Sequence, residues 1–223
     1  METAIIAMDG FASTGKSTLS KRLAAHMGYT YVDTGYMFRA ICWYGIYHQL
    51  IKGEVLDVEA LEQVLPSLKF SWKKTEDGSS LMAFNGRVHG EELRTVKVSQ
   101  WVSKMATLGS VRKHLLHQQR QLAAATSVVM DGRDIGTVVF PAAKHKFFLT
   151  AHAEVRAQRR FDEMQKKQIP GTYEEVLENV IARDHMDSNR DIAPMKPAED
   201  AIIIDTSDKN LEEVFLLLCS YLR

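Results

Sequence analysis

Five short apolar runs alternate with longer stretches of helical spacing along the chain. The runs are Ala4–Met8, Tyr29–Val32, Ser127–Met130, Lys146–Leu149 and Ala201–Ile204. Continuous apolar runs of this length are typical of strands that are buried on both faces, and their alternation with helices is typical of a parallel sheet. The pattern therefore predicts an α/β chain with a five-stranded parallel sheet between layers of helices.

The spacing changes between residues 53 and 97. Val58–Val64 has the pattern of a short helix, and residues 69–72 and 80–84 read as two strands joined by a turn over 75–79. A long helical stretch over residues 96–125 then leads to the third apolar run. An antiparallel pair inside a parallel-sheet chain predicts an inserted subdomain, which we expect to be a mobile lobe on the acceptor side.

Four of the apolar runs lead directly into an aspartate. These residues are Asp9, Asp33, Asp131 and Asp205. The carboxyl ends of parallel strands border the ligand crevice of an open sheet, so the aspartates predict a polar edge that suits Mg²⁺. Ordinary capping of the strand-to-loop turns is the alternative, and it is as good an explanation for Asp9 and Asp205.

The first run opens into Gly10-Phe11-Ala12-Ser13-Thr14-Gly15-Lys16-Ser17, and a helical pattern follows from Thr18. Glycines at these two places allow a tight turn whose N–H groups face phosphate oxygens. Lys16 would place a charge at the outer phosphates, and the Ser17 hydroxyl would bind Mg²⁺. The segment from Gly10 to Thr18 is thus predicted to bind a nucleoside triphosphate on a helix N-terminus. A plain glycine turn is the alternative.

Composition narrows the functional classes. Hydrophobic residues make up 45% of the 223 residues, and 28 basic residues balance 28 acidic ones, so there is no overall charge to attract nucleic acid.

Cys42 and Cys219 lack metal-ligand spacing, and we expect reduced thiols in a cytoplasmic protein. No signal peptide or membrane-spanning run is visible. We expect a monomer, because no apolar helix face is left unexplained.

Arginines recur close to the predicted crevice edge and hinges. Arg39, Arg112 and Arg133 follow the second run, the insert and the third run. Arg183, Asp187 and Arg190 share one helix face if the helix extends that far. A single arginine in such a place is ordinarily a solvated surface residue, but the set predicts a phosphate-bearing acceptor, because guanidinium groups bind phosphate in bidentate fashion.

Arg156, Arg159 and Arg160 lie together on one predicted helix that breaks at residues 169–171. They predict a lid that closes over ATP, excludes water and supplies positive charge to the transition state. Because acidic residues alternate with them, a salt-bridged exposed helix is an equally good explanation.

The chain resembles the bacterial cytidylate kinases from end to end. The resemblance rests on Gly10–Ser17, Asp33–Arg39, Asp131–Pro141 and Arg183–Arg190, of which the Asp131–Pro141 stretch is the most distinctive. It implies a P-loop NTPase-type three-layer fold in a single domain. The implied parts are a core of residues 1–52, 98–152 and 169–223, a monophosphate-binding insert of residues 53–97, and a lid of residues 153–168.

The resemblance also implies transfer of the γ-phosphoryl group of ATP to CMP or dCMP, with Lys16 and the lid arginines Arg156, Arg159 and Arg160 as catalytic residues. The implied acceptor set comprises Arg39, Arg133 and Arg190 for the phosphate, Ser103, Arg112 and Asp134 for the base, Arg183 and Asp187 for the sugar, and Thr34. Thr34 replaces a common serine and keeps its hydroxyl. Mg²⁺ would be held by Ser17 and, through water, by Asp131.

Two other classes of protein also carry such a phosphate loop. A shikimate or dephospho-coenzyme-A kinase would need a base for its neutral hydroxyl acceptor, and Arg112 and Asp134 would have no base to read. A nucleotide-operated switch would have no acceptor phosphate for the arginines to bind, and the chain has no Asn-Lys-x-Asp stretch for reading guanine. Acceptor-dependent ADP release distinguishes both from the main interpretation.

Overall fold

The computed structural model describes residues 3–76 and 80–222. Its contacts group the chain into two compact units. Glu2–Tyr31 and Val128–Arg223 form the unit that we call the sheet unit, and Val32–Ser127 form the helical unit. The helical unit spans a longer segment of the chain than the insert predicted over residues 53–97. The division into core, insert and lid stays a prediction.

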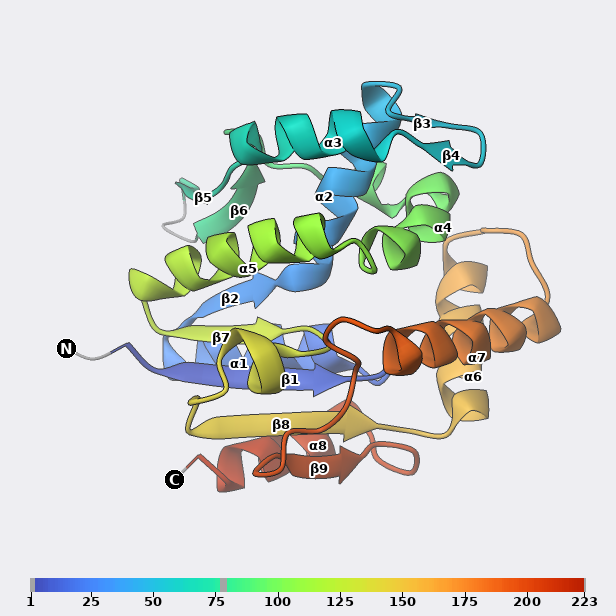
Figure 1. Ribbon diagram of the computed structural model, residues 1–223. Helices are drawn as coiled ribbons and strands as arrows, with labels where there is room; N and C mark the ends of the chain where they lie inside the picture. Colours follow the sequence, from blue (N-terminus) through green and yellow to red (C-terminus); the bar gives the residue numbers. More distant parts are fainter. Residues whose placement is uncertain (1–2, 77–79, 223) are drawn as a thin grey trace. The chain divides into compact units, whose positions relative to one another are not determined.

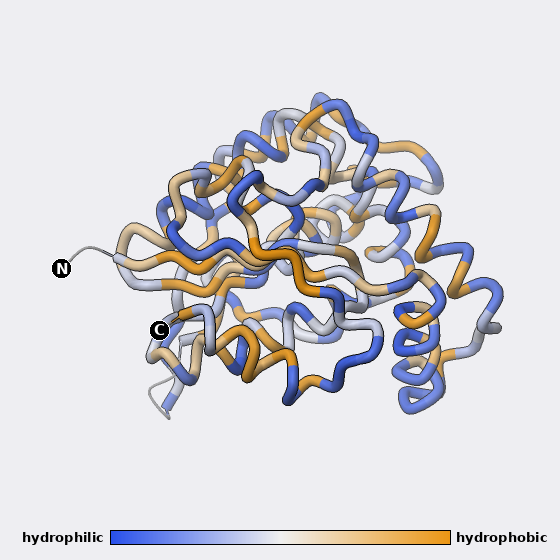
Figure 2. Tube along the Cα trace, turned by 90° about the horizontal axis from the view of Figure 1, so that it is seen from below, coloured by the Kyte–Doolittle hydropathy of each residue, from blue (hydrophilic) through white to orange (hydrophobic). Residues whose placement is uncertain are grey.

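A five-stranded parallel sheet forms the centre of the fold, in the order β2-β7-β1-β8-β9 (Figure 1). The strands are β1 (Ile5–Gly10), β2 (Thr30–Asp33), β7 (Val128–Asp131), β8 (His145–Thr150) and β9 (Ile202–Asp205). Each of the five apolar runs is thus confirmed as a strand, and so is the α/β class. In Figure 2 the extended segments carry long hydrophobic stretches, as expected for strands covered on both faces.

Helices α1 and α8 cover one face of this sheet. The helical elements of the sheet unit are α1 (Lys16–Met27), η3 (Ile135–Val139), α6 (Ala153–Lys166), α7 (Tyr173–Asn189) and α8 (Leu211–Ser220). Leu19 and Leu23 of α1 pack with Phe147 of β8 and with Phe215 and Leu218 of α8 in one buried cluster. This packing fixes the start of α1, where the phosphate loop ends.

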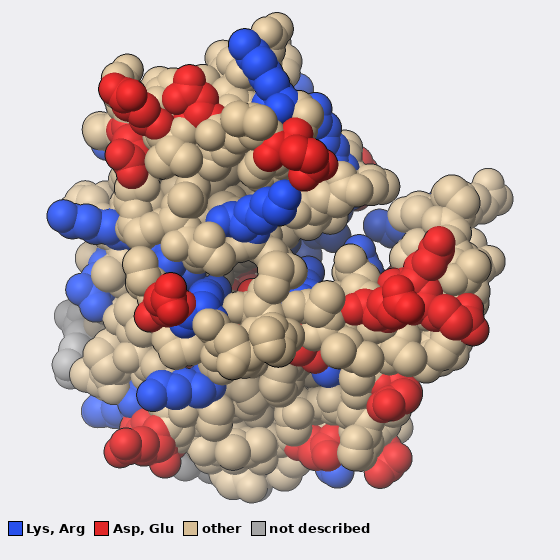
Figure 3. Space-filling model, turned by 45° about the vertical axis from the view of Figure 1, so that its right-hand side comes forward, with Lys and Arg blue, Asp and Glu red and all other residues tan. Residues whose placement is uncertain are grey.

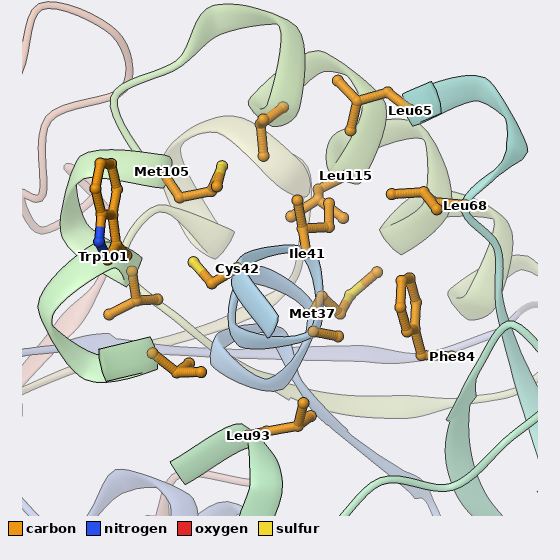
Figure 4. Close-up of a cluster of buried hydrophobic side chains, with 14 of the residues drawn as sticks. Met37, Ile41, Cys42, Leu65, Leu68, Phe84, Leu93, Trp101, Met105 and Leu115 are labelled. Carbon is orange, nitrogen blue, oxygen red and sulfur yellow. The ribbon is translucent and has the colours of Figure 1, made fainter. Parts of the chain in front are cut away.

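The helical unit has its own core, drawn in Figure 4. Its elements are α2 (Thr34–Tyr47), β3 (Ile51–Lys52), β4 (Val55–Leu56), α3 (Val58–Val64), η1 (Leu65–Ser67), β5 (Phe70–Lys74), β6 (Ser80–Phe84), η2 (Glu91–Arg94), α4 (Val96–Met105) and α5 (Gly109–Ala124). Met37, Ile41, Phe84 and Met105 meet in the cluster and are almost fully buried. The predicted helix over 58–64 and the antiparallel pair β5–β6 are confirmed. The predicted turn over 75–79 lies partly outside the described residues.

The single long helix predicted over residues 96–125 is wrong, because the chain forms α4 and α5 with a break between them. At the break the Thr107 hydroxyl donates to the carbonyl of Lys104, and the Arg112 side chain donates to the carbonyl of Ala106. These bonds satisfy the end of α4, and the bend lets Leu108 pack against the core. The pattern also missed the two-residue strands β3 and β4, which are too short to show a periodicity.

Candidate active site

The phosphate loop has the backbone that its glycines predict. Gly10 ends β1 at φ 136°, and a Cβ there would lie 2.0 Å from the carbonyl oxygen of Leu149, so only glycine fits. Gly15 precedes α1 at φ 87°, in the left-handed region that favours glycine. The Thr14 hydroxyl donates to the carbonyl of Phe11 at 3.0 Å and braces the loop from inside. The loop therefore ends on the N-terminus of α1, where anions are favoured.

Lys16 lies under this loop and is buried. Its ammonium donates to the carbonyl of Phe11 at 2.7 Å. Burial, together with the charge of Arg133, lowers the pKa of Lys16 to about 7, although the Asp131 carboxylate opposes the shift. An anion bound beside this ammonium would raise the pKa of Lys16 again, because an opposite charge stabilises the protonated form.

Ser17 and Asp131 meet at the carboxyl ends of adjacent strands. Residues Met8 and Asp131 are in register on β1 and β7, and the Ser17 hydroxyl donates to the Asp131 carboxylate at 2.5 Å. Tyr31 donates to the other oxygen of that carboxylate at 3.1 Å. A hydroxyl and a carboxylate are hard oxygen ligands, so the pair fits Mg²⁺ beside a phosphate loop. Among residues 3–76 and 80–222, no three His, Cys, Asp or Glu side chains form a separate metal-binding group.

Asp187, buried near the end of α7, lies among three of the predicted acceptor arginines. Arg133 donates to its carboxylate at 2.9 Å, and the side chains of Arg183 and Arg190 approach it to 3.9 and 4.0 Å. Burial alone would raise the pKa of Asp187, but the three arginines outweigh burial and lower it. Asp134 joins the cluster, with its carboxylate 3.8 Å from Arg190. Arg183 and Asp187 share a face of α7 as predicted, but the helix ends at Asn189, and Arg190 approaches Asp187 from the C-cap, where the backbone is extended.

The other acceptor residues belong to the helical unit. Asp33 caps α2 by accepting from the amide of Tyr36, and its second oxygen accepts from Arg39 at 2.8 Å. The Nε atom of Arg39 is buried and has no hydrogen-bond partner among the described residues. The Arg112 guanidinium lies 5.8 Å from the ring centre of Phe38. Thr34 opens α2 and is buried, whereas Ser103 is half-buried on α4.

The three arginines of α6 have different surroundings. Arg156 is buried and forms a bidentate ion pair with Asp184 of α7, with one N–O distance of 3.0 Å. It also donates to the carbonyl of Ala151 at 2.9 Å. Arg159 donates to the hydroxyl and carbonyl of Thr206, whereas Arg160 is exposed. Of the two explanations for this helix, the salt-bridged exposed surface does not describe Arg156.

The aspartates at the strand ends differ in the groups that they bind. Asp205 is exposed and accepts from the amide and hydroxyl of Ser207, so it is an ordinary cap of its own turn. Asp9 is buried, and it accepts from the amides of Ile135 and Gly136, which are distant in the sequence. Asp131 contacts the phosphate loop through Ser17, at the predicted metal edge, whereas Asp9 directly precedes the loop but bonds to the distant turn.

Comparison with known proteins decides the family. The family model described as cytidylate kinase matches residues 6–223. A cytidylate kinase of Flavobacterium johnsoniae is 47% identical over 216 residues, which cover 96% of this chain and 94% of the relative. A cytidylate kinase of Parabacteroides distasonis is 47% identical over 214 residues, covering 96% and 93%. The chain belongs to the cytidylate kinase family.

Membership in the cytidylate kinase family makes the protein a phosphotransferase that acts on nucleotides. Among solved structures, an uncharacterized protein from Eubacterium ventriosum matches 99% of this chain and 98% of its own with a TM-score of 0.51. At 12% identity, that match shows likeness of fold alone. Within residues 3–76 and 80–222, no helix is both long enough and apolar enough to span a membrane. The face drawn in Figure 3 carries basic and acidic side chains interspersed.

Three residues of the site were missed by the sequence patterns. Tyr31 binds the Asp131 carboxylate, Asp184 binds Arg156, and Thr206 binds Arg159. Tyr31 lies within an apolar run, Asp184 follows Arg183, and Thr206 follows Asp205, but none of these positions signals the contact that its side chain makes. Their partners are distant along the chain, and no local signal identifies them.

Proposed function

We propose that this protein transfers the γ-phosphoryl group of ATP to CMP or dCMP, giving ADP and CDP or dCDP. The observation that carries the proposal is the pairing, within one unit, of a complete phosphate loop with the arginine cluster around Asp187. The loop serves a triphosphate donor. The cluster serves a second anionic substrate, which a nucleotide-operated switch would not need.

Electrostatic neutralisation is the main task of the proposed site. Donor and acceptor phosphates repel one another, and charge on the migrating group is spread over its oxygens. Arg133 and Arg190, with Arg39 of the helical unit, are proposed to hold the acceptor phosphate. Lys16 and the α6 arginines Arg156, Arg159 and Arg160 are proposed to stabilise the migrating group. The acceptor oxygen is already an anion, so no general base is required, and positioning supplies much of the rate.

Discrimination between bases is assigned to Asp134, Arg112 and Ser103. A carboxylate accepts from the N4 amino group of cytosine, and Arg112 can donate to the O2 and N3 atoms. Uracil has a carbonyl in place of the amino group, so Asp134 would face a second acceptor. A site that depends on a specific hydrogen bond rejects an analogue lacking the bonding group. Arg183 and Asp187 are proposed to bind the sugar hydroxyls.

Mg²⁺ is the proposed companion of ATP. When bound, the ion would neutralise charge on the outer phosphates. Ser17 would supply a direct oxygen ligand, and Asp131 would hold the ion through water. Asp131 already accepts from both Ser17 and Tyr31, so the hydroxyl of Ser17 is held in place before the ion arrives. The remaining residues from Gly10 to Thr18 would hold the phosphates through their backbone.

The test is the formation of CDP from ATP and CMP, resolved from hydrolysis products by chromatography. We expect CDP and ADP to appear in equal amounts with the wild-type protein. Lys16→Ala should slow transfer to CMP and dCMP alike by about a hundredfold or more, because it removes a buried charge from the migrating group. ADP without CDP would identify a hydrolase and overturn the proposal. Glu213→Gln, at an exposed helix cap on α8, is the control for general damage.

A further inference from the structure

Asp9 is an unusual carboxylate, because it is buried and bonds to a distant turn. It lies on the central strand β1 and is 4% exposed. Its two oxygens accept from the amides of Ile135 and Gly136 at 2.8 and 2.7 Å, across more than 120 residues of sequence. Burial raises the pKa of Asp9 to about 6 against the effect of these two bonds. Burial therefore destabilises the ionised carboxylate, and both of its hydrogen bonds given above go to the same turn.

That turn is η3, and the residue before it is the proposed base reader Asp134. Asp134 is the N-cap of η3, with φ −148° and ψ 26°, but its side chain does not cap the turn. The Gly136 amide, which an N-cap side chain could satisfy, is bound by Asp9 instead, together with the preceding amide of Ile135. The backbone direction at Asp134 therefore depends on a group from β1.

Both sides of this contact are rigid. Asp9 precedes Gly10, whose Cα approaches the Leu149 carbonyl so closely that no side chain fits there. On the other side, a Cβ at Gly136 would lie 3.4 Å from the Asp9 carboxylate and 3.1 Å from the side chain of Lys146. The ammonium of Lys146 is itself held by Asp200 and by the carbonyl of Pro141, so the contact is closely packed, and we expect a change at Asp9 to reach the turn that carries Asp134.

We propose that Asp9 is a positioning residue that sets the selectivity for cytosine by fixing the turn that carries Asp134. The inference rests on the proposed function, since it needs Asp134 to read the base. Asp9 also lies directly before the phosphate loop, so one buried carboxylate links the donor loop to the acceptor turn. If Asp9 only capped the turn, changing it would lower the stability of the protein and reduce kcat/KM for CMP and UMP by the same factor.

The test compares kcat/KM for CMP and UMP in Asp9→Asn, in Asp134→Ala and in the double variant. An asparagine can accept from only one of the two amides, and its amino group opposes the other. We expect the CMP-to-UMP ratio to fall about tenfold in Asp9→Asn. In the Asp134→Ala background Asp9→Asn should lower the ratio no further, because both changes act through one contact. Glu213→Gln should keep the wild-type ratio.

Gly136→Ala provides a second variant if Asp9→Asn does not fold. The added methyl group would lie 3.1 and 3.2 Å from Cδ and Cγ of Lys146, a side chain whose ammonium is held by Asp200 and the Pro141 carbonyl, and it should shift the turn and lower the same ratio. An unchanged ratio with equal losses on CMP and UMP, in whichever of the two variants folds, would overturn the inference and leave the proposed function standing. Absence of CMP-dependent CDP formation in the wild-type protein would overturn both.

Discussion

Binding of ATP should draw a proton into the protein, because Lys16 is held in an environment that disfavours its charge. Burial lowers the pKa of Lys16 to about 7 in the protein without nucleotide, and the neighbouring Arg133 adds to this effect. The triphosphate brings several negative charges to the loop, and an opposite charge close to an ammonium raises its pKa. Lys16 should therefore become fully protonated in the complex.

The size of the effect depends on pH in a predictable way. With a pKa of about 7, roughly one tenth of the Lys16 side chains carry a proton at pH 8, so saturation with ATP should take up about 0.9 proton per protein. At pH 6 the side chain is already about nine tenths protonated, and the uptake should fall to about 0.1 proton. The contribution of Lys16 to proton uptake should thus increase from pH 6 to pH 8.

Isothermal titration calorimetry in buffers of different ionisation enthalpy measures this uptake. ATP is titrated without CMP, so that transfer does not contribute heat. Lys16→Met keeps much of the side-chain length and removes the titrating group, and the difference between wild type and variant corrects for protons that the nucleotide itself exchanges. Equal uptake by the two proteins at pH 8 would contradict a lowered pKa of Lys16, since it would mean that this side chain is charged before ATP binds.

Three further predictions test other parts of the site. Asp134→Ala should reduce kcat/KM for CMP about 10- to 100-fold while changing that for UMP little, and equal losses on both would exclude it as the base reader. Asp184→Ala should lower the unfolding free energy by about 3 kcal/mol in urea melts, because it leaves the Arg156 charge buried without its partner; a loss below about 1 kcal/mol would contradict this. The folded-state pKa of Asp9 is raised from 3.8 to about 6, so its ionised form opposes folding. The unfolding free energy of the wild type relative to Asp9→Asn should be highest below pH 4 and fall by about 3 kcal/mol as the pH rises above 6; parallel pH profiles for the two proteins would refute the shift.

The sheet could be predicted from the sequence because its signal is local. Each buried strand is a continuous apolar run, and the phosphate loop has fixed spacing between Gly10, Gly15 and Lys16. The face formed by Arg183 and Asp187 follows from helical periodicity alone. These features need no knowledge of distant neighbours.

The features that were missed depend on tertiary contacts. The break between α4 and α5 arises where Leu108 packs into the core and Arg112 satisfies the end of α4, and neither effect appears in a helical period. Asp9 looked like any strand-end aspartate, because the amides that it binds lie far along the chain. The ion pair between Asp184 and Arg156 joins two helices and has no spacing signal of its own.

The proposed reaction is tested by measuring, in parallel, release of ADP from Mg²⁺-ATP in the presence of CMP, dCMP, UMP, AMP or shikimate. We expect fast release with CMP and dCMP and slow release with the other three acceptors. Equal stimulation by UMP would remove the role of Asp134, and stimulation by shikimate alone would indicate a kinase with a hydroxyl acceptor. Failure of every acceptor to stimulate release would contradict the assignment of the arginine cluster around Asp187 to an acceptor phosphate.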